Sequence, residues 1–228
     1  RAWAHERIRD TTRPWCLLVT AVVLNHMELP VEHGATLGEL APSGYAVIGG
    51  KAMCTDEWDG YPAERERLVE VIHERGPGLV ALSGDVHSAW AFEGPCRGRD
   101  GDGGLPAGVE FVTPCVTATP MARQLPPGWR KLLGELAERL PEARWFDLEH
   151  HGFTVLEVDA AQVRNHWYAV DAEDPAARVR HCASWSHRWG DPGRLEPLDL
   201  GADPEAPLRA RSGAASTGPQ VVGLGQRR

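Results

Sequence analysis

The chain has 228 residues, of which 42% are hydrophobic and 25% are charged, enough for one globular domain or for a domain with a tail. Its formal net charge of -8 and the lack of a basic patch argue against a nucleic-acid partner. The five cysteines show no Cys-x-x-Cys spacing, so neither a disulfide framework nor a zinc finger is indicated. No apolar run approaches the roughly 20 residues needed to cross a membrane.

The chain begins at Arg1, with neither a methionine nor a signal peptide. We therefore expect it to be a segment of a longer polypeptide. The sequence specifies neither a compartment nor an oligomeric state.

The first half of the chain predicts helices and strands in alternation. Residues 3–13 are expected to end a helix, and the Val- and Leu-rich run at 15–24 predicts a buried strand. Many Gly and Pro residues indicate a loop over 30–50. Apolar residues at helical spacing predict a helix at 61–74, and a short buried strand follows at 79–82. This order is typical of a layered α/β fold.

The second half predicts mostly strands. The expected elements are a strand at 89–92, a loop at 97–104, a strand at 109–113, a helix within 127–140, a hairpin of 153–158 with 163–170, and a last strand at 179–185. From residue 190 the periodicity is lost and Pro, Gly, Ala and Arg dominate. We therefore expect one domain over 1–189 and a mostly disordered tail over 190–228.

The strand at 79–82 leads into Ser83-Gly84-Asp85-Val86-His87-Ser88. Positions i and i+2 at a strand end lie on the same side, so Asp85 and His87 can converge on one point. Gly84 lets the backbone approach a ligand closely. A carboxylate and an imidazole together suit iron, zinc or manganese. The alternative, a capping Asp and a surface His in a loop, fits this stretch equally well.

Four ordered blocks resemble the PhoD-like alkaline phosphatases of the metallophosphoesterase superfamily. Residues 56–65 (DEWDGYPAER), a helix and the motif at 83–88 match the family's D-x-W-D-G-Y, Arg, helix and L-[ST]-G-D-x-H-[ST]. Residues 110–117 (EFVTPCVT) resemble E-F-V-T-P-S-x-T, and 151–158 (HGFTVLEV) resemble H-G-Y-x-x-L-D-V. Residues 15–30 resemble a W-x-x-x-x-x-Q-V strand, so the resemblance covers about 5–170.

The resemblance implies part of a four-layer α/β/β/α sandwich that hydrolyses phosphate monoesters and diesters. It implies metal cofactors, iron and calcium or else manganese or zinc. It makes Asp85 and His87 metal ligands and hence the catalytic residues. It adds Asp59 as a further ligand, with Asp56 as the alternative. Both aspartates can instead be turn and N-cap residues before the helix, and Arg65 either meets a phosphate or is a solvated helix residue.

The family's upstream metal motifs are missing from this sequence: a Cys-bearing strand end, G-D-x-x-Y, and W-D-D-H-E with a following Asn. Ala21 and Cys115 also stand where the family tends to have Gln and Ser. The chain is therefore either a partial product or a degenerate homologue, and we expect little or no phosphatase activity from it alone. The alternative function is a non-catalytic metal-binding or interaction domain derived from the fold.

Overall fold

The structure, a computed structural model, describes residues 2–27, 29–30, 45–48, 51–94, 108–124, 135, 138 and 140–201. The helices are α1 (Ala2–Asp10), η1 (Trp58–Gly60), α3 (Pro62–Arg75) and α4 (Met121–Gln124). The strands are β1 (Cys16–Val19), β2 (Leu29–Pro30), β3 (Tyr45–Ile48), β4 (Lys51–Cys54), β5 (Leu79–Ser83), β6 (Ala89–Glu93), β7 (Gly108–Val112), β8 (Ala143–Asp147), β9 (Gly152–Val158), β10 (Gln162–Ala169), β11 (Arg180–Arg188) and β12 (Glu196–Pro197). Within these residues, no helix is long and apolar enough to span a bilayer.

A five-stranded sheet in the order β1-β5-β7-β6-β8 forms the centre of the molecule. β1, β5 and β7 run parallel, and β6 is antiparallel to both β7 and β8. β5 reads Leu-Val-Ala-Leu-Ser and every residue of β7 is buried, as expected of parallel strands covered on both faces.

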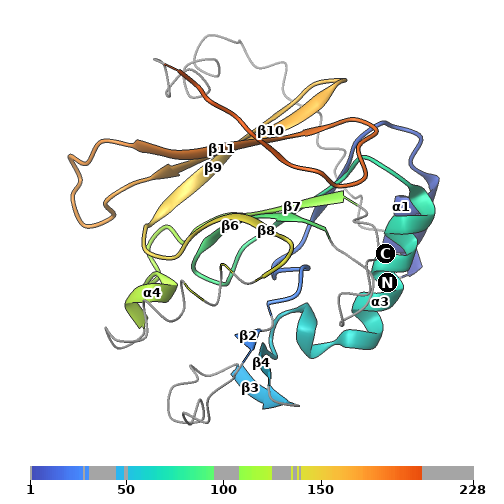
Figure 1. The fold of residues 1–228 in the computed structure, drawn as a ribbon, viewed down its shortest axis with the longest axis horizontal. Coiled ribbons are helices and arrows are strands. Elements are labelled where there is room, and N and C mark those ends of the chain that lie inside the picture. The colour runs from blue at the N-terminus through green and yellow to red at the C-terminus, as the bar shows by residue number, and fades with distance from the viewer. Residues whose placement is uncertain are drawn as a thin grey trace, which may run out of the picture.

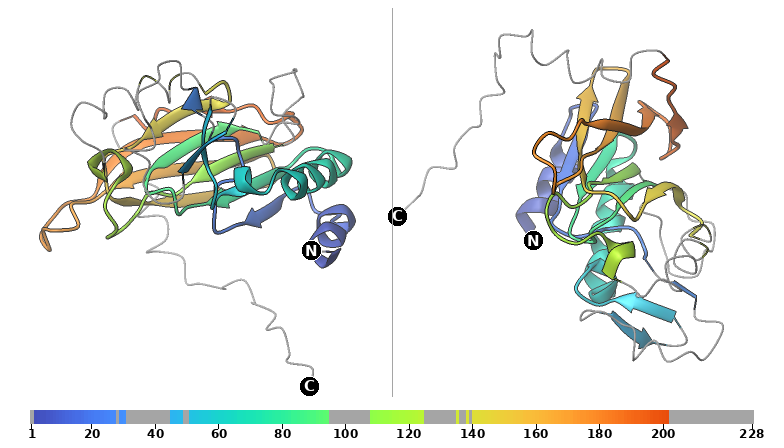
Figure 2. Two further views of the ribbon diagram at one scale, coloured as in Figure 1. Left: turned by 90° about the horizontal axis from the view of Figure 1, so that it is seen from below. Right: turned by 90° about the vertical axis from the view of Figure 1, so that its left-hand side faces the viewer.

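Helices α1 and α3 cover one part of the outer face of this sheet (Figures 1 and 2). Ile8 of α1 and Leu68 and Ile72 of α3 pack against Leu79 and Ala81 of β5. These apolar residues recur at helical spacing along α3, which is why a helix with a polar outer side forms here.

A second, four-stranded sheet in the order β12-β11-β10-β9 packs on the inner face of the first sheet (Figure 1). The core between the sheets contains Val80, Val109 and Phe111 on one side and Val163 and Trp167 on the other. The Trp167 indole also donates to the carbonyl of Val112 at 2.9 Å. The described residues thus form an α/β fold with a helical layer and two stacked sheets, as the sequence predicts.

Most expected elements are present with ends shifted by a few residues, but several segments differ. Strand β8 was not expected. The loop expected over 30–50 is wrong at β3, which lies within that range and forms a small sheet with β2 and β4. Residues 190–201 contain β12, which pairs with β11, and Leu195, which is buried between the sheets. The expected tail beyond 201, the 97–104 loop and nearly all of the 127–140 helix lie outside the described residues.

Candidate metal centre

Asp85 and His87 follow the carboxyl end of β5, and both have left-handed backbone conformations. Their φ angles are 70° and 55°, and no other described non-glycine residue has a positive φ. Such conformations cost about 1–3 kcal/mol each and concentrate at functional sites. The Asp85 side chain is exposed and that of His87 is partly buried.

The segment 119–124 holds His87 from two directions. The Met121 amide donates to the His87 carbonyl at 2.9 Å. The Nδ1 atom of the His87 ring lies 3.1 Å from the Thr119 carbonyl oxygen and 2.8 Å from the Gln124 side-chain nitrogen. These contacts orient the ring and leave its Nε2 atom with no hydrogen-bond partner among the described residues.

The donor atoms of this pair suit a metal ion. The Asp85 carboxylate accepts no hydrogen bond from the described residues, and imidazole with carboxylate is a common donor set for iron, zinc and manganese. Within the same residues, however, no three or more His, Cys, Asp or Glu side chains gather closely enough to hold a metal. The metal-ligand roles of Asp85 and His87 therefore stay a prediction, and these two residues alone would not complete a site.

Buried carboxylates organise the loop of residues 23–27, which follows β1. Glu110 of β7 is fully buried and accepts the amides of Leu24 at 2.8 Å and Asn25 at 2.7 Å. It also accepts the Asn25 side chain at 2.8 Å and the Ser83 hydroxyl at 2.5 Å. Glu57 accepts the amide of Val23. These bonds fix the loop beside the strand end that carries Asp85.

Asp59, the third predicted ligand, binds the same loop. One of its oxygens lies 2.5 Å from Nδ1 of His26, and the other accepts the Met27 amide at 2.8 Å. Its side chain is fully buried. Helix α3 begins after Tyr61 without any side-chain cap, so Asp59 is not a cap of that helix. Asp56 is exposed, and a ligand role for either aspartate stays a prediction.

The carboxylates around the strand end also influence one another. Burial raises the pKa of Glu57 to about 8, the Val23 amide opposes this rise, and the charges of Asp85, Asp56 and Glu110 add to it. Negative charge that is costly to maintain without a counter-ion favours a cation nearby. Without a cation nearby, Glu57 is therefore mostly protonated at neutral pH.

Three other residues lie in the sequence blocks that resemble the family. Arg65 is buried rather than solvated, and its Nε donates to the Leu24 carbonyl at 2.7 Å. The Nε2 atom of His151 lies 3.0 Å from the carbonyl of Ala118, so His151 is a hydrogen-bonding residue. Burial raises the pKa of the Cys115 thiol, which makes a reactive thiolate unfavourable.

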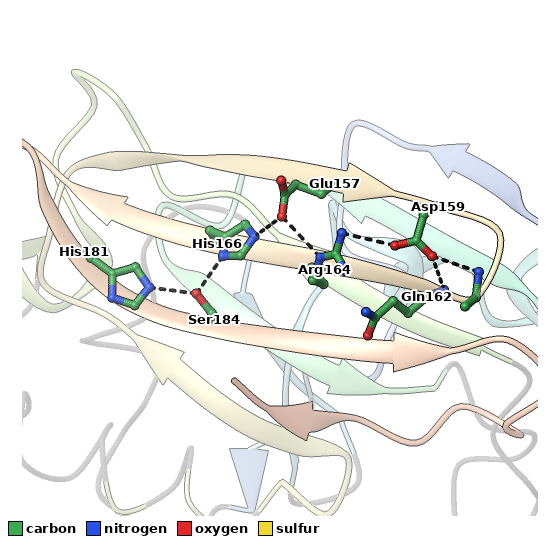
Figure 3. Close-up of polar contacts among 8 residues, drawn as sticks. Glu157, Asp159, Gln162, Arg164, His166, His181 and Ser184 are labelled. Atoms are coloured by element: carbon green, nitrogen blue, oxygen red, sulfur yellow. Dashed lines mark hydrogen bonds and ion pairs between the residues drawn. The ribbon is translucent and has the colours of Figure 1, made fainter. Parts of the chain in front are cut away.

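A second polar cluster lies on the four-stranded sheet (Figure 3). His166 of β10 contacts Ser184 of β11 through Nδ1 at 2.7 Å and Glu157 of β9 through Nε2 at 3.1 Å. His181 also contacts the Ser184 hydroxyl at 2.7 Å. Neighbouring side chains of a strand point to opposite faces of the sheet. Trp167 points into the core between the sheets, so His166 and its cluster lie on the other face.

Local patterns alone did not reveal Glu57, Glu110, His26 or Gln124. One signal was present: Glu110 is a charged residue inside the otherwise apolar run Gly-Val-Glu-Phe-Val. A carboxylate in such a strand must find several donors to be buried, which points to a structural or site role.

The layered sheets define an α/β protein in which the Asp-x-His pair follows the carboxyl end of β5. The comparisons specify the family. The sequence pattern of the PhoD-like phosphatases matches residues 1–167, so the chain belongs to that family. The family resemblance expected from the sequence is thereby confirmed.

Comparisons with individual proteins are consistent with this family assignment. A stretch of 37 residues is 51% identical to Alkaline phosphatase D of Bacillus subtilis (strain 168), covering 16% of this chain and 6% of that protein. The solved structure of PhoD superposes with a TM-score of 0.67 and 20% identity over 87% of this chain. That match covers 34% of the solved chain, and at this identity it shows the fold alone.

Proposed function

We propose that this chain supplies part of a metal-dependent phosphoesterase centre in which Asp85 and His87 are metal ligands. The observation that best supports this proposal is the left-handed backbone conformation of both Asp85 and His87 after β5. Both residues adopt this unfavourable backbone conformation although neither is a glycine. The Met121 amide donates to the carbonyl of His87. Family membership supports the reaction class, hydrolysis of phosphate monoesters or diesters.

The residues of the chain have separate roles in this proposal. Asp85 and His87 bind the cation, and the buried Glu57 and Glu110 keep the 23–27 loop rigid beside it. A bound metal ion supplies Lewis acidity toward the phosphoryl oxygens and a hydroxide near neutral pH. Iron with calcium, or manganese or zinc, are the proposed ions. Asp59 already contacts His26 through one oxygen and the Met27 amide through the other, and a further lone pair on either oxygen would serve as its metal donor.

A non-catalytic metal-binding domain is the second candidate. The small number of metal ligands favours this candidate. Among the described residues, no third His, Cys, Asp or Glu lies close enough to complete a metal site with Asp85 and His87. On either proposal we expect the chain alone to show little or no phosphatase turnover, because two donors hold a metal weakly.

Metal binding tests the ligand assignment. Calorimetric titration with Mn²⁺ or Zn²⁺ should give weak binding to the chain, and His87→Ala should reduce the affinity by at least about 10-fold. His150→Ala replaces an exposed histidine elsewhere and is the matched control. Equal affinities of the two variants would exclude His87 as a ligand.

Activity separates the two candidates. The chain is incubated with iron and calcium and an aryl phosphate, and product release is compared with that of His87→Ala. Metal-dependent turnover that disappears in the variant would favour a complete centre and overturn the expectation of low activity. Binding without turnover would favour the non-catalytic domain.

A further inference from the structure

An acceptor and a donor both lie within hydrogen-bond distance of the same nitrogen of the His87 ring. Nδ1 lies 3.1 Å from the Thr119 carbonyl and 2.8 Å from the Gln124 side-chain nitrogen. The same Gln124 nitrogen donates to the Thr119 carbonyl at 2.7 Å. The three atoms therefore form a small triangle around one corner of the ring.

A neutral imidazole carries one ring proton, so Nδ1 cannot satisfy both neighbours at once. A carbonyl only accepts, and it therefore requires the proton on Nδ1. The Gln124 NH₂ group donates, and it requires a lone pair on Nδ1, which places the proton on Nε2. Thr119 and Gln124 thus stabilise opposite tautomers of His87.

Metal binding through Nε2 requires one of these tautomers. A ligating nitrogen presents its lone pair, so the proton must be on Nδ1, where a carbonyl oxygen commonly holds it in metal sites. The Met121 amide donates to the His87 carbonyl and so anchors the backbone that carries the ring. The tautomer is then the variable that decides whether Nε2 can bind a cation.

We propose that Gln124 is a positioning residue that opposes metal binding at His87 by donating to Nδ1 and so favouring the Nε2–H tautomer. This inference rests on the proposed ligand role of His87. A cation at Nε2 would require the proton on Nδ1, where the Thr119 carbonyl would accept it in place of the Gln124 donor.

The proposal predicts how two substitutions at position 124 change metal affinity. Gln124→Met removes the competing donor, and we expect Mn²⁺ or Zn²⁺ to bind about 10-fold more tightly. Gln124→Glu replaces the donor with an acceptor of Nδ1–H, and we expect at least the same gain. Gln162→Met, on the half-buried start of β10, is the matched control and should leave the affinity unchanged.

The tautomer itself is measured without metal. Long-range ¹H–¹⁵N NMR of the chelator-treated chain, with His87 assigned through His87→Ala, identifies which ring nitrogen carries the proton. We expect mainly Nε2–H in the wild type and a shift toward Nδ1–H in Gln124→Met. A wild-type ring already in the Nδ1–H form, or a ratio unchanged by Gln124→Met, would overturn the proposal.

The two measurements distinguish the inference from the function on which it rests. If Gln124→Met shifts the tautomer while His87→Ala binds metal as well as wild type, the ligand role of His87 fails and the tautomer control by Gln124 stands. If His87→Ala loses binding but Gln124→Met and Gln124→Glu leave both tautomer and affinity unchanged, the ligand role stands and Gln124 has only a structural role.

Discussion

Glu110 illustrates how much one buried side chain can organise. It lies in the middle of β7 with no exposed surface, and it joins two chain segments through Ser83 and the amides of Leu24 and Asn25. A buried carboxylate is tolerated when several donors replace its hydration. Glu110 therefore fixes the 23–27 loop relative to the strand end of the candidate site.

We predict that Glu110→Gln lowers the free energy of unfolding by about 1–3 kcal/mol. The amide keeps the shape of the side chain but brings an NH₂ group against donors that now lack an acceptor. Urea unfolding followed by circular dichroism measures the change. Glu149→Gln, an exposed residue, should change stability by less than about 0.5 kcal/mol. An equally small effect at position 110 would contradict the organising role.

At the scale of elements, the cluster on β9, β10 and β11 links three strands through a directed series of hydrogen bonds (Figure 3). If the His166 ring donates from Nε2 to Glu157, its Nδ1 accepts from Ser184, which in turn accepts from His181. Arg164 contacts Glu157 and Asp159 from the same face. His166 must be neutral for this order to persist, because its Nδ1 accepts a hydrogen bond.

Burial lowers the pKa of His166 and of His181 below their ordinary value of 6.5, and Glu157 only partly offsets this for His166. The unfolded chain therefore takes up protons first as the pH falls. The stability contributed by the neutral histidines is present above pH 6.5 and is lost as the pH falls through the folded-state pKa values.

We predict that the stability of wild type relative to His166→Gln falls between about pH 8 and about pH 5.5, since His166 is lost as a titrating group in the variant while Glu57 titrates alike in both chains. The glutamine amide can still bond to Ser184 and Glu157 but does not titrate in this range. Urea midpoints at each pH give the comparison, with the exposed His150→Gln as control. Parallel pH profiles for wild type and His166→Gln would refute this account of the cluster.

At the scale of the whole molecule, β1 lies at one edge of the five-stranded sheet, and no other described strand pairs with its outer side. β1 is the end strand, and the amides of Cys16 and Thr20 both point to β5, at 2.8 and 3.0 Å from their acceptors. The backbone groups of Leu17 and Val19 therefore point away from the sheet. Their side chains are 45% and 75% exposed. Exposed apolar edge strands promote association.

We predict that the chain associates as its concentration rises and that Val19→Lys reduces this association, because a charge at the edge opposes strand pairing. Sedimentation velocity over a concentration series measures the effect. Val116→Lys introduces the same charge at an exposed valine outside any strand. If both variants reduce association equally, net charge rather than the β1 edge is responsible.

The sequence determined the family, the order of most strands and the position of Asp85 and His87, because these depend on local patterns. Helical spacing predicted α3, apolar runs predicted β5 and β7, and the motif after β5 identified the two candidate ligands.

Only the tertiary structure decided the contacts of Glu110 and Asp59, since they join residues 86 and 32 positions apart. It also decided that Arg65 is buried, that β12 adds to the second sheet, and that Gln124 lies beside His87. The spacing of residues along a strand or helix carries no information about partners brought together by packing. The motif after β5 could therefore be read from the sequence, whereas the groups that hold its loop and its ring in place could not.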